Sequence, residues 1–201
     1  MRDFIGHSTW HGLGAELEEY CAPDDVARVK RAWDYAADAH GDQRRPSGEP
    51  YVAHLSEAVQ VLLHVGITEP TLLIAALLHD VVEDTDRTLD EIRAEFGSEV
   101  AELVDWVTKP PIPVGVDKAT HKASYLQRFQ EAPADAVTVK LADRYSNVQR
   151  LANHPSVEKR YSYFQETVDN ILPLATAHPL FADLYQTWHK KNQHYANGSP
   201  R

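Results

Sequence analysis

The sequence predicts an all-α protein with a single domain. Apolar residues recur with helical spacing through most of the chain, and no stretch alternates long enough to form a half-buried strand. Glycine, proline and capping residues divide this pattern into segments of ordinary helix length. A chain of 201 residues is also long enough to enclose one complete hydrophobic core.

The N-terminal half is expected to hold an irregular lead-in followed by five helices. The lead-in, residues 1–24, contains three glycines and a proline. Thr68 with Pro70 predicts a helix start, and Thr88 with Glu91 has the spacing of a capping box. The five helices are expected at 24–40, 51–65, 68–84, 88–97 and 98–108.

The C-terminal half is expected to be helical after a proline-rich loop at 108–118. Further helices are predicted near 118–130, 134–152, 156–176 and 179–195. The last residues resemble a frayed terminus. The sequence therefore predicts an N-terminal extension at 1–25, one domain at 26–195 and a flexible tail at 196–201.

Composition narrows the class of protein. The formal net charge of −10 argues against a nucleic-acid-binding role, which normally requires a basic surface. A single cysteine excludes an intrachain disulfide framework and suits a reducing compartment. No apolar run is long enough for a signal peptide or a membrane span. We expect a cytoplasmic protein without a membrane partner; whether it forms a homo-oligomer is left open.

The strongest local signal is the segment LLHDVVEDTD, residues 77–86, where an apolar run ends in a histidine and several acids. Two carboxylates about 4 Å apart at an effective dielectric of 20 repel each other by about 4 kcal/mol. A divalent cation would offset this repulsion, whereas a helix end that emerges into water is the alternative. On a continuous helix, four side chains would share an arc of roughly 140°: His79, Asp80, Glu83 and Asp84.

Two distant residues could complete a metal site. His54 lies on a predicted helix near its apolar face, where a hydrogen-bonded core histidine is the alternative. Asp143 follows an apolar stretch, where a salt bridge with Lys140 or Arg144 is the alternative. Two imidazoles and two carboxylates suit a divalent metal. We expect manganese first, with iron, zinc or magnesium as the other choices.

Three segments carry a family resemblance: AHGDQRRPSGEPYVAH, LLHDVVEDTDRTLDEIRAEFGSEVAELVDWVTK and VKLADRYSNVQRL. The ordered set of histidines and aspartates resembles the metal signature of HD-domain phosphohydrolases, which have a helical-bundle fold. The longer match, over roughly residues 26–175, resembles the hydrolase domain of RelA/SpoT proteins, in particular the stand-alone small alarmone hydrolases. Those enzymes remove pyrophosphate from the 3′ position of ppGpp and pppGpp, so the resemblance implies a guanine nucleotide substrate.

The resemblance also implies a role for individual residues. The metal, commonly manganese in this family, would be held by His54, His79, Asp80 and Asp143. Glu83 and Asp84 would orient the attacking water and move protons. The substrate would be contacted by Arg45, which packs on the guanine, and by Ser47, Tyr51, Lys122, Lys140 and Asn147.

Three departures from the family pattern keep other functions open. Pro46 stands where relatives usually have lysine, Leu55 stands where proline is usual, and Gln149-Arg150 replaces a more common Arg-Thr pair. One alternative is hydrolysis of another nucleotide, such as NADPH or a nucleoside phosphate. A second is a catalytically silent nucleotide-binding module, against which the intact acidic pair counts.

Overall fold

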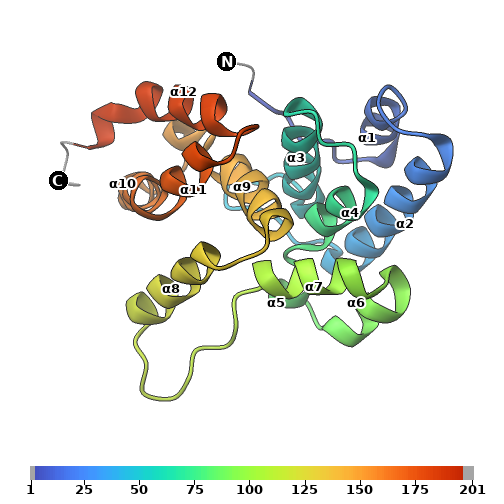
Figure 1. Cartoon of the computed structure of the whole chain (residues 1–201), viewed down its shortest axis with the longest axis horizontal. Helices are drawn as coiled ribbons and strands as arrows, with labels where there is room; N and C mark the ends of the chain where they lie inside the picture. Colours follow the sequence, from blue (N-terminus) through green and yellow to red (C-terminus); the bar gives the residue numbers. More distant parts are fainter. Residues whose placement is uncertain (1–2, 197–201) are drawn as a thin grey trace.

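The computed structural model describes residues 3–196, and these residues form helices joined by loops (Figure 1). No strand occurs among the described residues, so the all-α prediction is confirmed. Short 3-10 helices lie at Arg128–Gln130, Leu151–Asn153 and Gln193–Tyr195. The α-helices are α1 (Trp10–Leu17), α2 (Pro23–His40), α3 (Tyr51–His64), α4 (Pro70–Leu78), α5 (Val81–Asp84), α6 (Leu89–Phe96), α7 (Ser98–Val107), α8 (Lys118–Gln127), α9 (Ala134–Val148), α10 (Val157–Glu166), α11 (Leu172–Ala177) and α12 (Ala182–Asn192).

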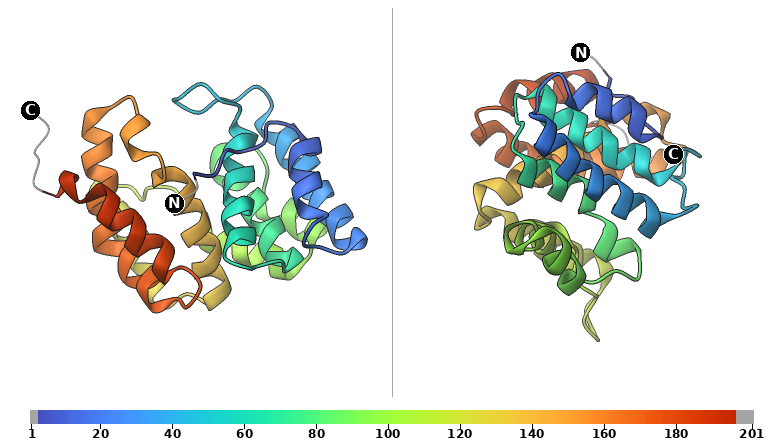
Figure 2. Two further views of the ribbon diagram at one scale, coloured as in Figure 1. Left: turned by 90° about the horizontal axis from the view of Figure 1, so that it is seen from above. Right: turned by 90° about the vertical axis from the view of Figure 1, so that its right-hand side faces the viewer.

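The centre of the molecule is the contact between α3 and α9, with α4 packed against both (Figures 1 and 2). Helices α2 and α7 cover the other sides of α4, so that α4 is buried along its whole length. On the far side of α9, Tyr185 of α12 donates to the Leu141 carbonyl over 2.7 Å, and Trp188 donates to the Val148 carbonyl over 2.9 Å. Helix α9 therefore joins the N-terminal and C-terminal helices into one body.

The prediction of an irregular lead-in is wrong, because α1 forms within it and contributes to the core. Leu13 and Leu17 are fully buried. The glycines that suggested irregularity permit close contacts instead: a Cβ on Gly14 would lie 2.9 Å from the Trp10 ring, and one on Gly12 would lie 2.2 Å from a ring atom of His7. Here a small residue inside a helix marks a crowded position.

The prediction of one helix over 68–84 is also wrong, because the chain turns at His79 and Asp80 between α4 and α5. The His79 ring nitrogen Nδ1 lies 2.7 Å from the Ala76 carbonyl oxygen. In a continuous α-helix that oxygen would accept from the Asp80 amide, so the imidazole competes for it. Helix α4 begins after an N-cap at Glu69, one residue later than the predicted cap at Thr68.

Other predicted boundaries hold to within a few residues, with one interruption. The capping box is confirmed: Thr88 accepts from the Glu91 amide, and its own amide donates to the Glu91 side chain. The helix predicted over 156–176 contains a π-helical turn at Thr167–Ile171. No helix in the described range is long and apolar enough to cross a membrane. Residues 197–201 of the predicted tail lie outside the described residues, and the division at 1–25, 26–195 and 196–201 stays a prediction.

Candidate metal centre

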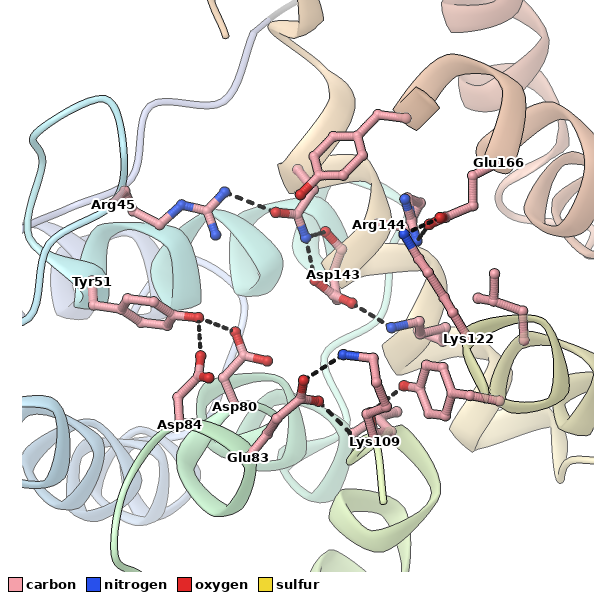
Figure 3. A pocket seen from close by; sticks show the side chains of 16 residues that line it. Arg45, Tyr51, Asp80, Glu83, Asp84, Lys109, Lys122, Asp143, Arg144 and Glu166 are labelled. Atoms are coloured by element: carbon pink, nitrogen blue, oxygen red, sulfur yellow. Dashed lines mark hydrogen bonds and ion pairs between the residues drawn. The ribbon is translucent and has the colours of Figure 1, made fainter. Parts of the chain in front are cut away.

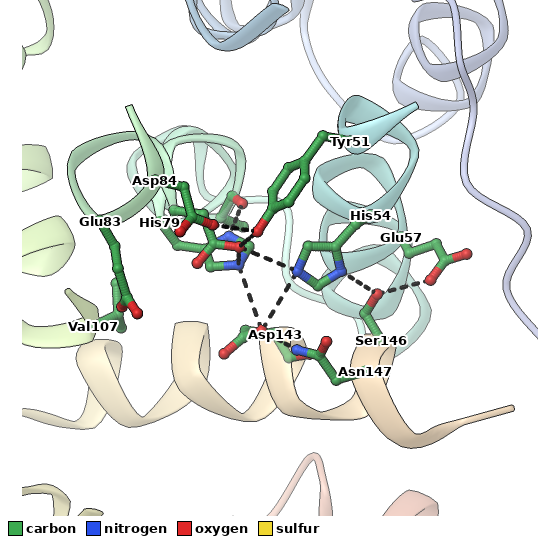
Figure 4. A network of polar contacts seen from close by, with 12 residues as sticks. Tyr51, His54, Glu57, His79, Glu83, Asp84, Val107, Asp143, Ser146 and Asn147 are labelled. Atoms are coloured by element: carbon green, nitrogen blue, oxygen red, sulfur yellow. Dashed lines mark hydrogen bonds and ion pairs between the residues drawn. The ribbon is translucent and has the colours of Figure 1, made fainter. Parts of the chain in front are cut away.

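Four predicted ligands converge from three parts of the fold. His54 comes from the first turn of α3, His79 and Asp80 from the turn after α4, and Asp143 from the middle of α9 (Figures 3 and 4). The Nε2 atom of His54 lies 3.5 Å from Asp80 Oδ2 and 3.6 Å from Asp143 Oδ1. The corresponding distances from His79 Nε2 are 3.2 and 3.4 Å. The four side chains that the sequence singled out therefore lie around one point.

These four groups fit a divalent metal ion. Both Nε2 atoms are buried, and neither has a hydrogen-bond partner within residues 3–196. An imidazole nitrogen that is desolvated without a partner is costly, so something should satisfy it. Ligand atoms about 2.0–2.2 Å from one ion lie about 3.0–3.6 Å from their neighbours, which matches the observed spacings. His54, His79 and Asp80 each offer a ligand atom, and these three atoms lie within 4.8 Å of one another.

The electrostatics point to the same conclusion. Burial by itself would lower the pKa of His79, but the Asp80 and Asp143 carboxylates raise it well above its usual value. Burial by itself would raise the pKa of each carboxyl group, yet neighbouring cationic groups hold both pKa values well below their usual range. The two carboxylates therefore stay ionised in a buried place, where a protonated imidazole, Lys140 or a bound cation must balance their charge.

The predicted acidic pair lies on α5 at the edge of this cluster. Asp84 Oδ2 accepts a hydrogen bond of 2.6 Å from the Tyr51 hydroxyl, which also lies 2.7 Å from Asp80 Oδ2. Glu83 contacts Lys109, accepting from its backbone amide at 3.0 Å and from its Nζ at 2.5 Å. The two carboxylates are thus held by different partners, one from α3 and one from the loop after α7.

A cavity of about 220 Å³ opens beside the cluster, and both acidic and basic side chains line it, several of them paired with one another (Figure 3). Lys140 donates to Asp143 Oδ2 over 2.8 Å. Glu166 of α10 pairs with both Lys122 and Arg144. Of the predicted substrate contacts, all but one line this cavity: Arg45, Tyr51, Lys122, Lys140 and Asn147.

A second hollow adjoins the cavity, and Arg45 and Asn147 line both. The Arg45 guanidinium donates to Asn147 Oδ1 over 2.8 Å, and Asn147 Nδ2 lies 2.5 Å from Asp143 Oδ1. Ser47 lines only the second hollow, where its hydroxyl donates to Glu49 over 2.8 Å. A ligand that filled both hollows would contact both Arg45 and Asn147.

Residues 32–180 match the family model described as HD domain. The chain belongs to the HD-domain family. A solved structure of a metazoan ortholog of SpoT, described as hydrolysing ppGpp with a role in starvation responses, superposes with a TM-score of 0.71 at 30% identity. That match covers 82% of this chain and 95% of the other. It places this HD-domain chain among the RelA/SpoT-type members.

Curated HD-domain relatives agree with this placement. A guanosine-3′,5′-bis(diphosphate) 3′-pyrophosphohydrolase from Aquifex aeolicus is 36% identical over 81% of this chain. The bifunctional (p)ppGpp synthase/hydrolase SpoT from Escherichia coli K12 is 34% identical over 83% of this chain. The matches cover 23% and 24% of those two proteins, so this chain corresponds to less than a quarter of their length.

Sequence reasoning missed several groups that complete this HD-domain site. Lys109 comes from the end of a segment that carries the family resemblance, but no role was assigned to it; Glu166 comes from α10, outside the three quoted segments. His40, at the end of α2, stacks on Tyr51 with ring centroids 4.4 Å apart. A usable signal existed on α3, where Glu57 is a charged residue on a helix whose residues 51–63 are buried or nearly so; it is 5% exposed.

Proposed function

We propose that this protein hydrolyses the 3′-pyrophosphate of ppGpp or pppGpp, giving GDP or GTP and pyrophosphate. The observation that carries the proposal is the convergence of His54, His79, Asp80 and Asp143 beside a cavity that both acidic and basic side chains line. A pyrophosphate ester carries several negative charges and resists a nucleophile until they are neutralised. This cavity supplies both the cations and the carboxylates that such a reaction needs.

The proposed metal ligands are His54, His79, Asp80 and Asp143. A divalent ion held there would polarise a phosphoryl oxygen and lower the pKa of water from 15.7 toward about 7. Manganese is proposed as the ion, with iron, zinc and magnesium as alternatives. Affinity order alone does not choose among these metals.

Glu83 and Asp84 are the proposed proton carriers. The water oxygen would form a bond to the phosphorus next to the 3′ oxygen, and the bond between that phosphorus and the 3′ oxygen would break. One carboxylate accepts the proton of the attacking water, and the departing 3′ oxygen receives a proton. Tyr51 keeps Asp84 facing Asp80. Lys109 restrains Glu83 through its backbone amide and its Nζ.

The cations are proposed to bind the phosphates and the base. Lys122, Lys140 and Arg144 line the cavity and would neutralise phosphoryl oxygens. Arg45 presents a flat guanidinium, which can stack on a purine. It already lies over the Tyr51 ring at 5.9 Å. We propose that the guanine occupies the second hollow, beside Arg45.

A substrate panel tests the proposal. The purified protein is stripped of metal with a chelator, reloaded with Mn²⁺ and incubated with ppGpp, pppGpp, NADPH and simple nucleoside phosphates. We expect GDP or GTP and pyrophosphate from the two alarmones, and no turnover without metal. Absence of pyrophosphate release from ppGpp would reject the proposal.

The two alternatives have clear signatures in the same panel. Turnover of only NADPH or a nucleoside phosphate would show that the substrate is another nucleotide. Pro46 keeps this alternative open, because it stands where relatives usually have a lysine and so removes a cation from the loop before α3. Nucleotide binding without turnover would indicate a silent module. Cytoplasmic location, lack of nucleic-acid binding and oligomeric state stay predictions from the sequence.

A further inference from the structure

A buried chain of polar groups leads away from the metal centre at His54. The Nδ1 atom of His54 lies 2.8 Å from Ser146 Oγ on α9, and Ser146 Oγ lies 2.7 Å from Glu57 Oε2 on α3. Figure 4 shows the three side chains in a row, with Glu57 farthest from the metal ligands. The Glu57 side chain is only 7% exposed. Its carboxylate is unusual for a helix in the middle of a core.

Glu57 decides the direction of the hydrogen bonds in this chain. A serine hydroxyl can donate or accept, so Ser146 alone does not determine which nitrogen of His54 carries the proton. A carboxylate only accepts, so the Ser146 proton must point toward Glu57. Ser146 Oγ then accepts from Nδ1–H of His54. The free electron pair of His54 therefore lies on Nε2, which faces the other metal ligands.

The Glu57 carboxylate is surrounded by donors. Its Oε2 accepts from Gln149 Nε2 at 3.0 Å, in addition to Ser146. Its Oε1 accepts from the Arg150 guanidinium and from the Gly6 amide, the latter at 3.3 Å. With only donors around it, the carboxylate is fixed as the acceptor at the end of the chain.

The N-terminal segment Phe4–Gly6 closes this arrangement. The Phe4 amide donates to Gln149 Oε1 over 2.7 Å, and the Phe4 carbonyl accepts from Arg150. The Phe4 ring is buried against Tyr145 and His64. The close approach also requires the glycine of this segment, because a Cβ there would lie 1.8 Å from the Ala53 carbonyl oxygen.

We propose that Glu57 is a positioning residue that acts through Ser146 to hold His54 in its metal-binding tautomer. The segment Phe4–Gly6 completes the arrangement through Gln149 and Arg150. This assignment rests on the metal site of the proposed function and extends it to the N-terminal segment. It also gives a structural role to the Gln149-Arg150 pair, which differs from the usual residues of the RelA/SpoT resemblance.

The variant Glu57→Gln tests the assignment with almost no change of shape. The new amide nitrogen must replace one of the two carboxylate oxygens, and each of these oxygens faces hydrogen-bond donors. Arg150 and the Gly6 amide cannot become acceptors, and the Phe4 amide holds Gln149 in its orientation, whereas the Ser146 hydroxyl can turn. The amide nitrogen is therefore expected to face Ser146 and to reverse its hydrogen bond. Nδ1 of His54 then becomes the acceptor, and the proton moves to Nε2.

Two measurements on the full-length, chelator-treated protein report this change. Titration calorimetry with Mn²⁺ should show a dissociation constant about 10–100-fold higher than that of the wild type. The ¹⁵N chemical shifts of His54 should show that the protonated nitrogen has changed from Nδ1 to Nε2. The control is Glu16→Gln, because this carboxylate holds His7 and Gln60 of the same region but touches no proposed ligand.

Wild-type Mn²⁺ affinity with an unchanged His54 spectrum in Glu57→Gln would overturn the assignment. If that variant does not fold, Ser146→Ala replaces it, since it breaks the same chain with a smaller change and should weaken Mn²⁺ binding similarly. Unchanged affinity in Ser146→Ala would also overturn it. A wild type that binds Mn²⁺ without releasing pyrophosphate would reject only the proposed function. Normal turnover with unchanged affinity in the variants would reject only this assignment.

Discussion

The two imidazoles of the proposed metal centre are oriented in different ways. His79 Nδ1 donates to the Ala76 carbonyl, three residues earlier in the same stretch of chain. His54 Nδ1 instead meets Ser146, which lies 92 residues away and depends in turn on Glu57. One imidazole is therefore held by local backbone, and the other by side chains from two helices.

Substitutions should therefore affect the orientation of His54 much more easily than that of His79. A backbone carbonyl accepts whatever side chain it carries, so the orientation of His79 survives most substitutions nearby. The orientation of His54 depends on a hydroxyl and a carboxylate, and on the N-terminal segment that packs over them. Metal affinity can thus be tuned from the His54 side without a change to any proposed ligand.

The largest expected effect comes from Asp143→Asn, which removes the carboxylate that both imidazoles face at 3.4 and 3.6 Å. The amide keeps the shape of the side chain but loses the charge that favours a cation. Without a bound metal, the different orientation of the two imidazoles should no longer affect metal affinity. We expect Mn²⁺ content near zero by elemental analysis and no pyrophosphate release. Asp135→Asn, an exposed change on the same helix, is the control and should retain the metal. Full metal content in Asp143→Asn would show that the proposed ligand set is wrong.

Glu83→Ala should have the next largest effect and should separate the use of the metal from its binding. The Glu83 carboxylate contacts Lys109 and none of the proposed ligands. We expect kcat to fall about 10²–10⁴-fold, as for loss of a general acid or base, while Mn²⁺ content stays at the wild-type level. Stopped assays of pyrophosphate release with parallel elemental analysis measure both quantities. Loss of the metal, or a wild-type kcat, would contradict the proposed role. The control is Glu99→Ala in the exposed first turn of α7, which should leave both quantities unchanged.

The sequence predicted well wherever the cause was local or periodic. The capping box at Thr88 and the buried apolar stretch of α4 follow from spacing alone, and both are present. The convergence of His54, His79, Asp80 and Asp143 was also predicted, because charged or polar residues inside apolar runs require a partner. Each of these signals can be read within a single stretch of the chain, without knowledge of the fold.

Contacts between distant segments were not predictable in this way. The N-terminal glycines resembled a flexible lead-in, although Gly14 fits against Trp10 and Gly6 fits against α3. The turn at His79 coincides with a contact between the imidazole and a backbone oxygen of the preceding turn, which helix propensity does not describe. The partners of Glu57 come from two segments that are far from it in the sequence, the end of α9 and the N-terminal segment, so only the fold brings them together.

The smallest expected effect lies on the opposite wall of the cavity, away from both imidazoles. Burial by itself would raise the pKa of Glu166, but the Arg144 and Lys122 cations lower it below its usual value. Such a carboxylate stabilises the fold at pH values above its unfolded pKa of about 4.3. That stability is lost as the pH falls through the lower pKa of the folded protein.

Glu166→Gln should therefore lower the free energy of unfolding by about 1–3 kcal/mol at pH 7, because it leaves the buried Arg144 without its partner. The difference from the wild type should be constant above about pH 5 and should narrow at lower pH. Denaturant unfolding from pH 3 to 7 measures this profile. Asp34→Asn, which removes an exposed pair with Lys30, is the control and should follow the wild-type curve closely. A difference that persists unchanged at the acid end would show that the ionised carboxylate is not what stabilises this wall.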